Sequence, residues 1–320
     1  MRVVVALGGN AIKQAHEAGT AEEQFKNCET TSEALAKIVS EFKDGDSLVV
    51  THGNGPQSGN LDVQQVAGKE KVPAQPLDIV GAMTQGQIGY MIMNTMEKHL
   101  KAHGVDADVI ACVNQVVVDP KDPEFVGDNA SKPVGNFFSE EEAKALKEAH
   151  PDYVIKHVKP SAEKGWRRTV PSPLPARNAE LRAINKILDA GIICIASGGG
   201  GIPVMEDADG NFQGLEAVID KDRAGEVLAE GVKADVFMVL TDVENAILNY
   251  GKENAQAIGE VKLADMQKYA SEGHFLAGSM GPKVASAMKF VEWGGQKAII
   301  TSLDKAVDAL AGKCGTIITK

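Results

Sequence analysis

The sequence predicts an α/β fold in which a sheet of parallel strands is covered by helices on both faces. Short apolar runs recur along the 320 residues, and most of them show no alternation of polar and apolar side chains. Runs of that kind are typical of strands buried on both faces. Segments with helical spacing separate the runs, and this alternation is the signature of a doubly wound sheet. The predicted strands are Val3–Leu7, Ser47–Thr51, Asp108–Val118, Ile192–Ala196, Val236–Leu240, Ala298–Thr301 and Thr316–Thr319.

Two of the predicted helices carry clear boundary signals. Between Thr20 and Phe42 the apolar residues follow one helical stripe, and Thr20 with Glu23 has the pattern of a capping box. Arg182–Ala190 repeats the helical spacing, and Gly191 is placed to end that helix. Helices therefore alternate with the predicted strands, as a doubly wound sheet requires.

One segment, residues 119–175, breaks this alternation. It is rich in proline, which favours loops, turns and edge strands. We interpret it as a small inserted subdomain that acts as a lid. The rest of the chain is predicted to form an N-terminal lobe of residues 1–118 and 176–205 and a C-terminal lobe of residues 206–320. The insertion is not expected to be a disordered linker, because it holds the aromatic residues Phe125, Phe137, Phe138, Tyr153 and Trp166.

The composition excludes some classes of function. The formal net charge is −11 and the isoelectric point is near 5.2, so a nucleic-acid partner, which would need a basic face, is not expected. The four cysteines are widely separated and form no CxxC pair, so we expect neither a disulfide framework nor a zinc site. No signal peptide is recognisable, and no apolar stretch approaches the roughly 20 residues that span a bilayer. We therefore expect a cytoplasmic protein without a membrane partner.

Three glycine-rich turns directly follow predicted strands, at Gly8–Asn10, His52–Gln57 and Ser197–Pro203. Such turns let backbone N–H groups approach an anion at the strand ends where α/β folds bind ligands. Pro56 suits the first turn of a helix, so the second turn is also a helix N-terminus, a natural anion site. Any single turn could be a plain connection, but four consecutive glycines in the third favour close approach to a ligand. His52 is more consistent with packing than with a general base.

Lysines beside glycine or proline turns supply positive charge. They are Lys132 in the insertion, Lys221 next to Asp222, and Lys283. Phosphoryl transfer depends on such charge around the moving group, although any one lysine could simply be a solvated surface residue. The sequence lacks a Walker GxxxxGK[ST] motif, a GxGxxG after the first strand, HExxH and GxSxG. These absences disfavour a P-loop protein, a dehydrogenase, a zincin protease and an α/β-hydrolase. The residues therefore favour phosphoryl transfer at a shared anion site.

Nine segments, in order over nearly the whole chain, resemble carbamate kinases, a branch of the amino acid kinases. The Trp-Arg-Arg and Pro-Ser-Pro segments and the insertion are the features specific to that branch. The segments are Ala6–Ala11, Thr51–Gln57, Gln85–Tyr90, Gly165–Arg168, Val170–Pro173, Ala196–Pro203, Ile219–Asp222, Thr241–Val243 and Met280–Lys283.

The resemblance implies an open three-layer αβα sandwich with a mainly parallel central sheet, a protruding inserted subdomain and a homodimer. It also implies reversible transfer of a phosphoryl group between ATP and carbamate, giving ADP and carbamoyl phosphate, with Mg²⁺ held through the nucleotide phosphates and no protein ligands to the metal assigned. The N-terminal lobe would then bind carbamate, and the C-terminal lobe would bind the nucleotide. The expected direction is ATP synthesis in arginine fermentation, through the arginine deiminase pathway.

The resemblance also assigns roles to particular residues. Lys132 would reach in from the insertion, Lys221 and Lys283 would neutralise phosphate charge, and Asp222 would organise these lysines. The residues expected to hold carbamate and the transferred phosphoryl group are Gly8, Gly9, Asn10, Gly53 and Asn54, together with Gly199 and Gly200 from the third turn. The residues expected at the nucleotide are Thr241, Asp242, Tyr250, Met280, Gly281 and Lys283.

One departure from the parent family bears on the acceptor. Many amino acid kinases have a lysine two residues before the glycine pair, whereas this chain has Ala6, and Lys132 is expected to substitute for it. The alternatives are another kinase of the family with a different small acid acceptor, or a regulatory protein that binds nucleotide without turnover. A larger acceptor needs room, whereas the carbamate-type insertion predicts a cramped pocket.

Overall fold

The computed structural model describes residues 1–320 except 15, 277 and 278, and the side chain of Asn10 is also outside the described part. Its centre is an eight-stranded sheet in which every neighbouring pair is parallel except β16 and β17. From one edge to the other the strands are β15 (Glu260–Lys262), β17 (Thr316–Thr319), β16 (Lys297–Ser302), β12 (Val236–Thr241), β1 (Arg2–Leu7), β2 (Ser47–His52), β9 (Ile193–Ile195) and β3 (Val109–Ala111).

Helices cover both faces of this sheet, as the sequence predicted. Side chains alternate along β1, so Val3, Val5 and Leu7 enter one core and Val4 and Ala6 enter the other. The first core includes α1 (Ala21–Ser40), α3 (Leu77–Ala102) and α9 (Ala306–Leu310). The second includes α5 (Leu181–Asp189), α6 (Lys221–Gly231), α7 (Leu263–Ser271) and α8 (Met280–Trp293). The predicted open αβα sandwich is therefore confirmed.

The predicted strand Asp108–Val118 was wrong, because the chain leaves the main sheet in its middle. β3 ends at Ala111, and β4 (Gln115–Val118) belongs to a second sheet with β8 (Pro175–Asn178), β10 (Ile202–Glu206) and β11 (Phe212–Gly214). Asn114 lies at the break and is fully buried. Its N–H donates to Gln85 Oε1 (2.9 Å), its Nδ2 donates to Asn178 Oδ1 (2.9 Å), and its Oδ1 accepts from the Ser197 N–H (2.7 Å). An apolar run does not reveal such a polar pivot.

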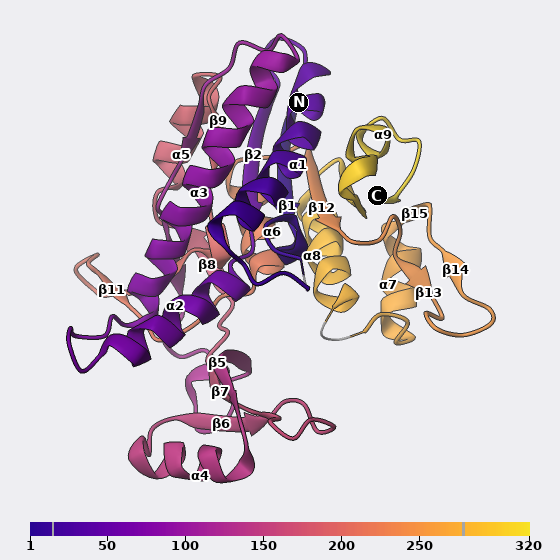
Figure 1. Cartoon of the computed structure of the whole chain (residues 1–320). Coiled ribbons are helices and arrows are strands. Elements are labelled where there is room, and N and C mark those ends of the chain that lie inside the picture. Colours follow the sequence, from indigo (N-terminus) through magenta and orange to yellow (C-terminus); the bar gives the residue numbers. More distant parts are fainter. Residues whose placement is uncertain (15, 277–278) are drawn as a thin grey trace.

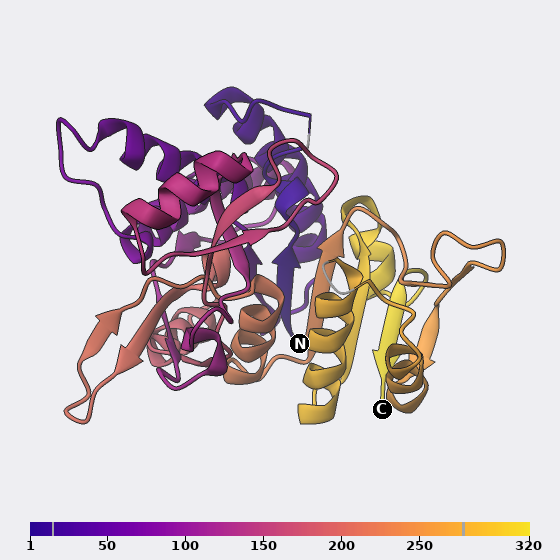
Figure 2. The same cartoon turned by 90° about the horizontal axis from the view of Figure 1, so that it is seen from below.

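The predicted insertion holds a small antiparallel sheet in the order β5-β7-β6, with one helix. Its elements are η2 (Pro123–Phe125), β5 (Lys132–Phe138), α4 (Glu140–Ala149), β6 (Val154–His157) and β7 (Trp166–Val170). The sheet and α4 project away from the main body (Figure 1) and, seen from below, lie on the side of α2 (Gly55–Gly68) rather than that of α7 (Figure 2). The main sheet runs unbroken from β3 to β15, so the two predicted lobes share it. Their boundaries stay a prediction.

The capping box predicted for α1 is present, with Glu23 N–H donating to Thr20 Oγ1 and Thr20 N–H donating to a Glu23 carboxylate oxygen. Among the described residues, no helix combines the length and the apolar character that crossing a membrane requires. The short elements are η1 (Gly9–Ala11), η3 (Gly198–Gly200), β13 (Ile247–Leu248), β14 (Gln256–Ala257) and η4 (Leu303–Lys305).

Candidate active site

The glycine turns after β1 and β2 lie side by side at the carboxyl edge of the main sheet. The Gly8 N–H donates to Leu240 O (3.0 Å) at the end of β12, and the Gly53 N–H donates to Leu7 O (3.3 Å) at the end of β1. A Cβ on Gly53 would lie 3.0 Å from Cδ of Lys221, so glycine leaves room for that lysine side chain. The convergence predicted for these two turns is confirmed, and Lys221 joins them.

Three helices begin at this edge. α2 starts after Asn54 with Pro56 in its first turn, α6 starts after Asp220, and α8 starts after Ser279. The first N–H groups of a helix have no partner within the helix, and the helix dipole makes that end partly positive. Three such ends facing one space make a strong anion site.

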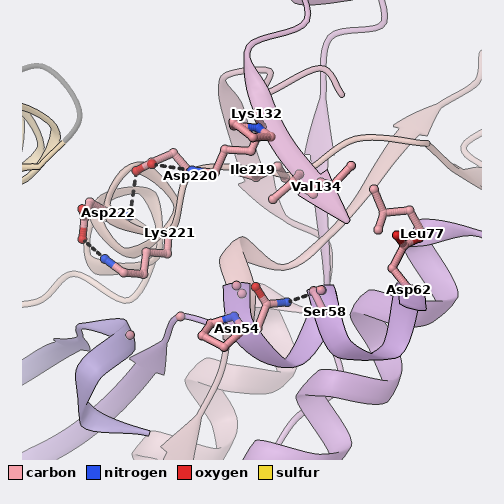
Figure 3. Close-up of a pocket in the computed structure, with 18 of the residues that line it drawn as sticks. Asn54, Ser58, Asp62, Leu77, Lys132, Val134, Ile219, Asp220, Lys221 and Asp222 are labelled. Atoms are coloured by element: carbon pink, nitrogen blue, oxygen red, sulfur yellow. Dashed lines mark hydrogen bonds and ion pairs between the residues drawn. The ribbon is translucent and has the colours of Figure 1, made fainter. Parts of the chain in front are cut away.

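A cavity of about 330 Å³ lies between these helix ends and the insertion. Figure 3 shows Asn54 just before α2, Ser58 in α2, Lys221 and Asp222 at the start of α6, and Lys132 of β5 around it. Four cations and three carboxylates line the cavity, namely Lys132, Arg167, Lys221, Lys283, Asp62, Asp220 and Asp222. Its charged lining suits a small anionic ligand.

Asp222 holds two of the predicted lysines. Its Oδ1 lies 2.8 Å from Lys221 Nζ and its Oδ2 lies 3.2 Å from Lys283 Nζ, and its side chain is only 4% exposed. Burial lowers the pKa of Lys283, and the neighbouring Lys221 lowers it further, while Asp222 opposes both effects. The carboxylate therefore keeps two mutually repelling ammonium groups together, as predicted for this pair.

Lys132 does not pair with Asp222, which corrects the expectation that one carboxylate organises all three lysines. Lys132 Nζ lies 3.1 Å from Oδ2 of Asp220, a residue that the sequence reading passed over. Asp220 is also the N-cap of α6, and its Oδ1 accepts from the Asp222 N–H (3.0 Å) and the Arg223 N–H (3.4 Å). An aspartate directly before a helix start is a readable signal for such a cap.

The close approach predicted for the glycine run 198–201 is to other protein groups. A Cβ would lie 2.4 Å from His52 Nε2 on Gly198, 2.1 Å from Asn54 Nδ2 on Gly199, 2.4 Å from Ile219 O on Gly200 and 2.2 Å from Val116 Cγ2 on Gly201. Three of the four also have positive φ, from 67° to 98°. Packing against these groups therefore accounts for the glycines, and the approach of a ligand to this run stays a prediction. Gly199 still lines the cavity, whereas Gly200 is not among the described lining residues.

His52 is a packing residue, as the sequence favoured. It is buried, its Nδ1 lies 3.0 Å from Gly53 O, and burial lowers its pKa to about 4. Asn54 points its Nδ2 to Thr84 Oγ1 (2.9 Å) and lines the cavity.

Two further cavities extend from the first one towards the C-terminal part of the chain. One, of about 460 Å³, shares Gly9, Lys221, Ser279 and Lys283 with it and adds Gly8. A third cavity, of about 180 Å³, adjoins the second one. The two have Thr241, Asp242 and Ser279 in common. We call the first the acceptor cavity, the second the phosphate cavity and the third the base cavity, after the ligand groups that the resemblance assigns to their lining residues.

The base cavity has an apolar lining that suits an aromatic ring. Four predicted nucleotide residues line it, namely Thr241, Asp242, Tyr250 and Met280. The apolar side chains of Phe275 and Leu276, which the sequence analysis did not single out, line it too. Gly281 is not among the described residues of any of the three cavities, and a Cβ there would lie 2.9 Å from Leu276 O. Asn10 lies in η1 beside these cavities, but its side chain is outside the described part.

The fold and the anion-binding cavities are those of a kinase of the amino acid kinase family, and the chain belongs to that family, whose model matches residues 1–302. Within it the chain belongs to the carbamate kinases. The carbamate kinase of Thermococcus kodakarensis is 51% identical over 100% of this chain and 99% of its own length, and that of Pyrococcus furiosus is 49% identical over 98% of each. The solved structure of carbamate kinase from Giardia lamblia bound to AMP-PNP has 44% identity and a TM-score of 0.92 over 100% of this chain and 98% of that one.

Proposed function

We propose that the protein transfers a phosphoryl group reversibly between ATP and carbamate, giving ADP and carbamoyl phosphate. The observation that carries the proposal is the position of Lys221 and Lys283, held by Asp222. Both lysines line the acceptor cavity and the phosphate cavity, so they lie where a phosphoryl group would pass from one to the other. The carbamate kinase relatives, which match the chain over its whole length, support the choice of acceptor.

The proposed mechanism is direct in-line transfer. A carbamate oxygen attacks the γ-phosphorus, the bond from that phosphorus to the β–γ bridging oxygen breaks, and ADP leaves with the electron pair. Carbamate is already an anion, so it needs no strong base; it needs its repulsion from the γ-phosphoryl group cancelled, which the lysines and helix N-termini do. Asp222 is not placed as a nucleophile, because each of its oxygens is paired with a lysine. A phosphoenzyme is therefore not part of the proposal.

Magnesium is proposed to enter with the nucleotide. Among the described residues no cluster of three or more His, Cys, Asp or Glu side chains could hold a metal ion. The donor set fits an ion that binds mainly through phosphates, with Asp242 and Asp304 of the phosphate cavity as the carboxylates that would hold it. The ion supplies charge neutralisation on the phosphates.

The physiological setting is also part of the proposal. We propose that the enzyme works in the cytoplasm as a homodimer, mainly towards ATP synthesis from carbamoyl phosphate in the arginine deiminase pathway. These points rest on the resemblance to carbamate kinases and on their full-length similarity.

The acceptor cavity is larger than the cramped pocket that the sequence predicted. Its volume of about 330 Å³ exceeds what carbamate alone would fill. The insertion, whose β5 lines this cavity, projects from the main body (Figure 1). Room alone would therefore also admit a larger acid acceptor. Closure of the insertion over the substrate would reconcile this volume with carbamate.

The proposal is tested by supplying ADP, Mg²⁺ and carbamoyl phosphate and measuring ATP. ATP formation is expected, and none from a folded protein would contradict the proposal; nucleotide binding without turnover would favour the regulatory alternative. Lys132→Ala is expected to lower kcat by about 100-fold or more, because one positioned charge in a site of this kind contributes about that factor, while ADP binding is kept. Lys121→Ala removes an exposed lysine of the same insertion and is the matched control.

A further inference from the structure

One carboxylate, that of Asp220, joins the insertion to the start of α6. Its Oδ2 accepts from Lys132 Nζ at 3.1 Å, across 88 residues of sequence. Its Oδ1 accepts from the Asp222 N–H at 3.0 Å, and Asp222 in turn holds Lys221 and Lys283. All three lysines of the site are therefore linked through two neighbouring carboxylates.

The segment that leads to Asp220 is attached to the base of the insertion at two further points. Glu216 pairs with Arg168 of β7 at 3.0 Å and also accepts from the Leu77 N–H at 3.0 Å. The Val218 N–H donates to Pro171 O at 2.9 Å. Residues 216–220 thus run along the base of the insertion and end at the N-terminus of α6, so this segment joins the base of the insertion to α6.

The surroundings keep Asp220 charged. Burial alone would raise its pKa, but Lys132, Lys221 and the Arg223 N–H together lower the pKa below its ordinary value. Lys132 itself is 37% exposed on its side chain and its only described ion pair is the one with Asp220. A long lysine side chain with one partner loses its fixed position when that partner is removed.

We propose that Asp220 is a positioning residue for the phosphoryl transfer, which fixes Lys132 Nζ in the acceptor cavity in register with the Lys221–Asp222–Lys283 group. The inference rests on the proposed function and deepens it. Lys132 comes from the insertion and the other two lysines from the main body, so some contact must hold them in one arrangement. Asp220 provides that contact, and without it Lys132 samples positions away from the transferred group.

A purely electrostatic role for Asp220 predicts a different outcome, which makes the proposal testable. If the carboxylate only added negative charge, its removal would strengthen anion binding, and KM for carbamoyl phosphate would fall with kcat unchanged. If it positions Lys132, kcat falls instead, by about 10- to 100-fold, as expected when a charged group is misplaced by about an ångström.

The experiment compares Asp220→Asn, Lys132→Met and the double variant, with ATP formation from ADP and carbamoyl phosphate as the assay. Asparagine is as good an N-cap as aspartate, so α6 is expected to stay intact. Asp220→Asn is expected to lower kcat, to leave KM for ADP and the melting temperature unchanged, and to have no further effect once Lys132 is Met. Asp207→Asn is the matched control, since Asp207 also accepts backbone N–H groups, from Asp209 and Asn211, but lies in an exposed hairpin.

Two outcomes would overturn the proposal. One is an unchanged kcat in Asp220→Asn, with or without a lower KM, and the other is that the effects of the two single variants multiply in the double variant. If Asp220→Asn both lowered the melting temperature and weakened ADP binding, Asp220 would have a structural role instead. Failure of the proposed function is distinguishable from all of these, because the wild-type protein would then form no ATP in the same assay.

Discussion

Gly199→Ala tests the packing account of the glycine run most directly. Gly199 has φ 67°, and a Cβ built on it lies 2.1 Å from Nδ2 of Asn54, far inside van der Waals contact. Asn54 is buried and donates from the same Nδ2 to Thr84 Oγ1 at 2.9 Å. The added methyl group must therefore displace the Asn54 side chain, which lines the acceptor cavity.

The expected magnitude is the sum of two contributions. A left-handed backbone with a Cβ costs about 1 kcal/mol. Displacing Asn54 loses its hydrogen bond and overpacks the site, which costs about 2 kcal/mol more. Gly199→Ala should therefore lower the free energy of unfolding by about 3 kcal/mol.

The matched control is Gly45→Ala. Gly45 has φ 83°, but a Cβ there meets nothing within 4 Å, so only the backbone contribution of about 1 kcal/mol applies. The assay is urea unfolding of both variants and the wild-type protein, combined with KM for carbamoyl phosphate. Gly199→Ala should shift the urea midpoint more than Gly45→Ala and should raise KM. Equal shifts for the two variants, or an unchanged KM, would refute the reasoning.

Three further predictions concern buried charges. His52 has its pKa lowered to about 4 by burial. Its neutral form should therefore contribute up to about 3 kcal/mol to the free energy of unfolding, which is present above pH 6.5 and lost as the pH falls through 4. Unfolding measured from pH 7 to 4 should show this loss, and His52→Gln should reduce it. Burial and a hydrogen bond to Glu230 raise the pKa of Glu226 to about 8, although Lys289 opposes the rise. The wild-type protein should therefore lose stability relative to Glu226→Gln as the pH rises from 4.5 to 8, so that the variant is the more stable of the two at pH 8. Equal stability of the two proteins at pH 8 would contradict this. Asp222→Asn leaves two lysines without their carboxylate, so calorimetry should show a loss of about 3 kcal/mol and kcat should fall at least 100-fold, whereas a retained kcat would argue against the proposed mechanism.

The sequence determined the fold class because burial on both faces leaves a direct mark on the chain. Strands such as β1 and β12 are apolar on every residue but one at an end, Arg2 and Thr241, and an uninterrupted apolar run cannot serve an exposed strand. The turns after β1 and β2 were also readable, since parallel strands bring their carboxyl ends to one edge. The Lys221–Asp222 dipeptide and Lys283 were predicted for the same site, and both are in it.

Only the tertiary structure decided which groups pair across long separations. The resemblance implied that Asp222 organises all three lysines, whereas Lys132 pairs with Asp220, 88 residues away along the chain. Asp220 and Asp222 carry the same chemical group two positions apart, so local pattern alone does not tell which of them a distant lysine meets. The glycine run shows the same limit: glycine marks a close approach, but what approaches is set by packing, here Asn54 and the Ile219 carbonyl. Local patterns record what each residue needs from its surroundings, whereas the identity of the neighbour depends on how distant segments are brought together.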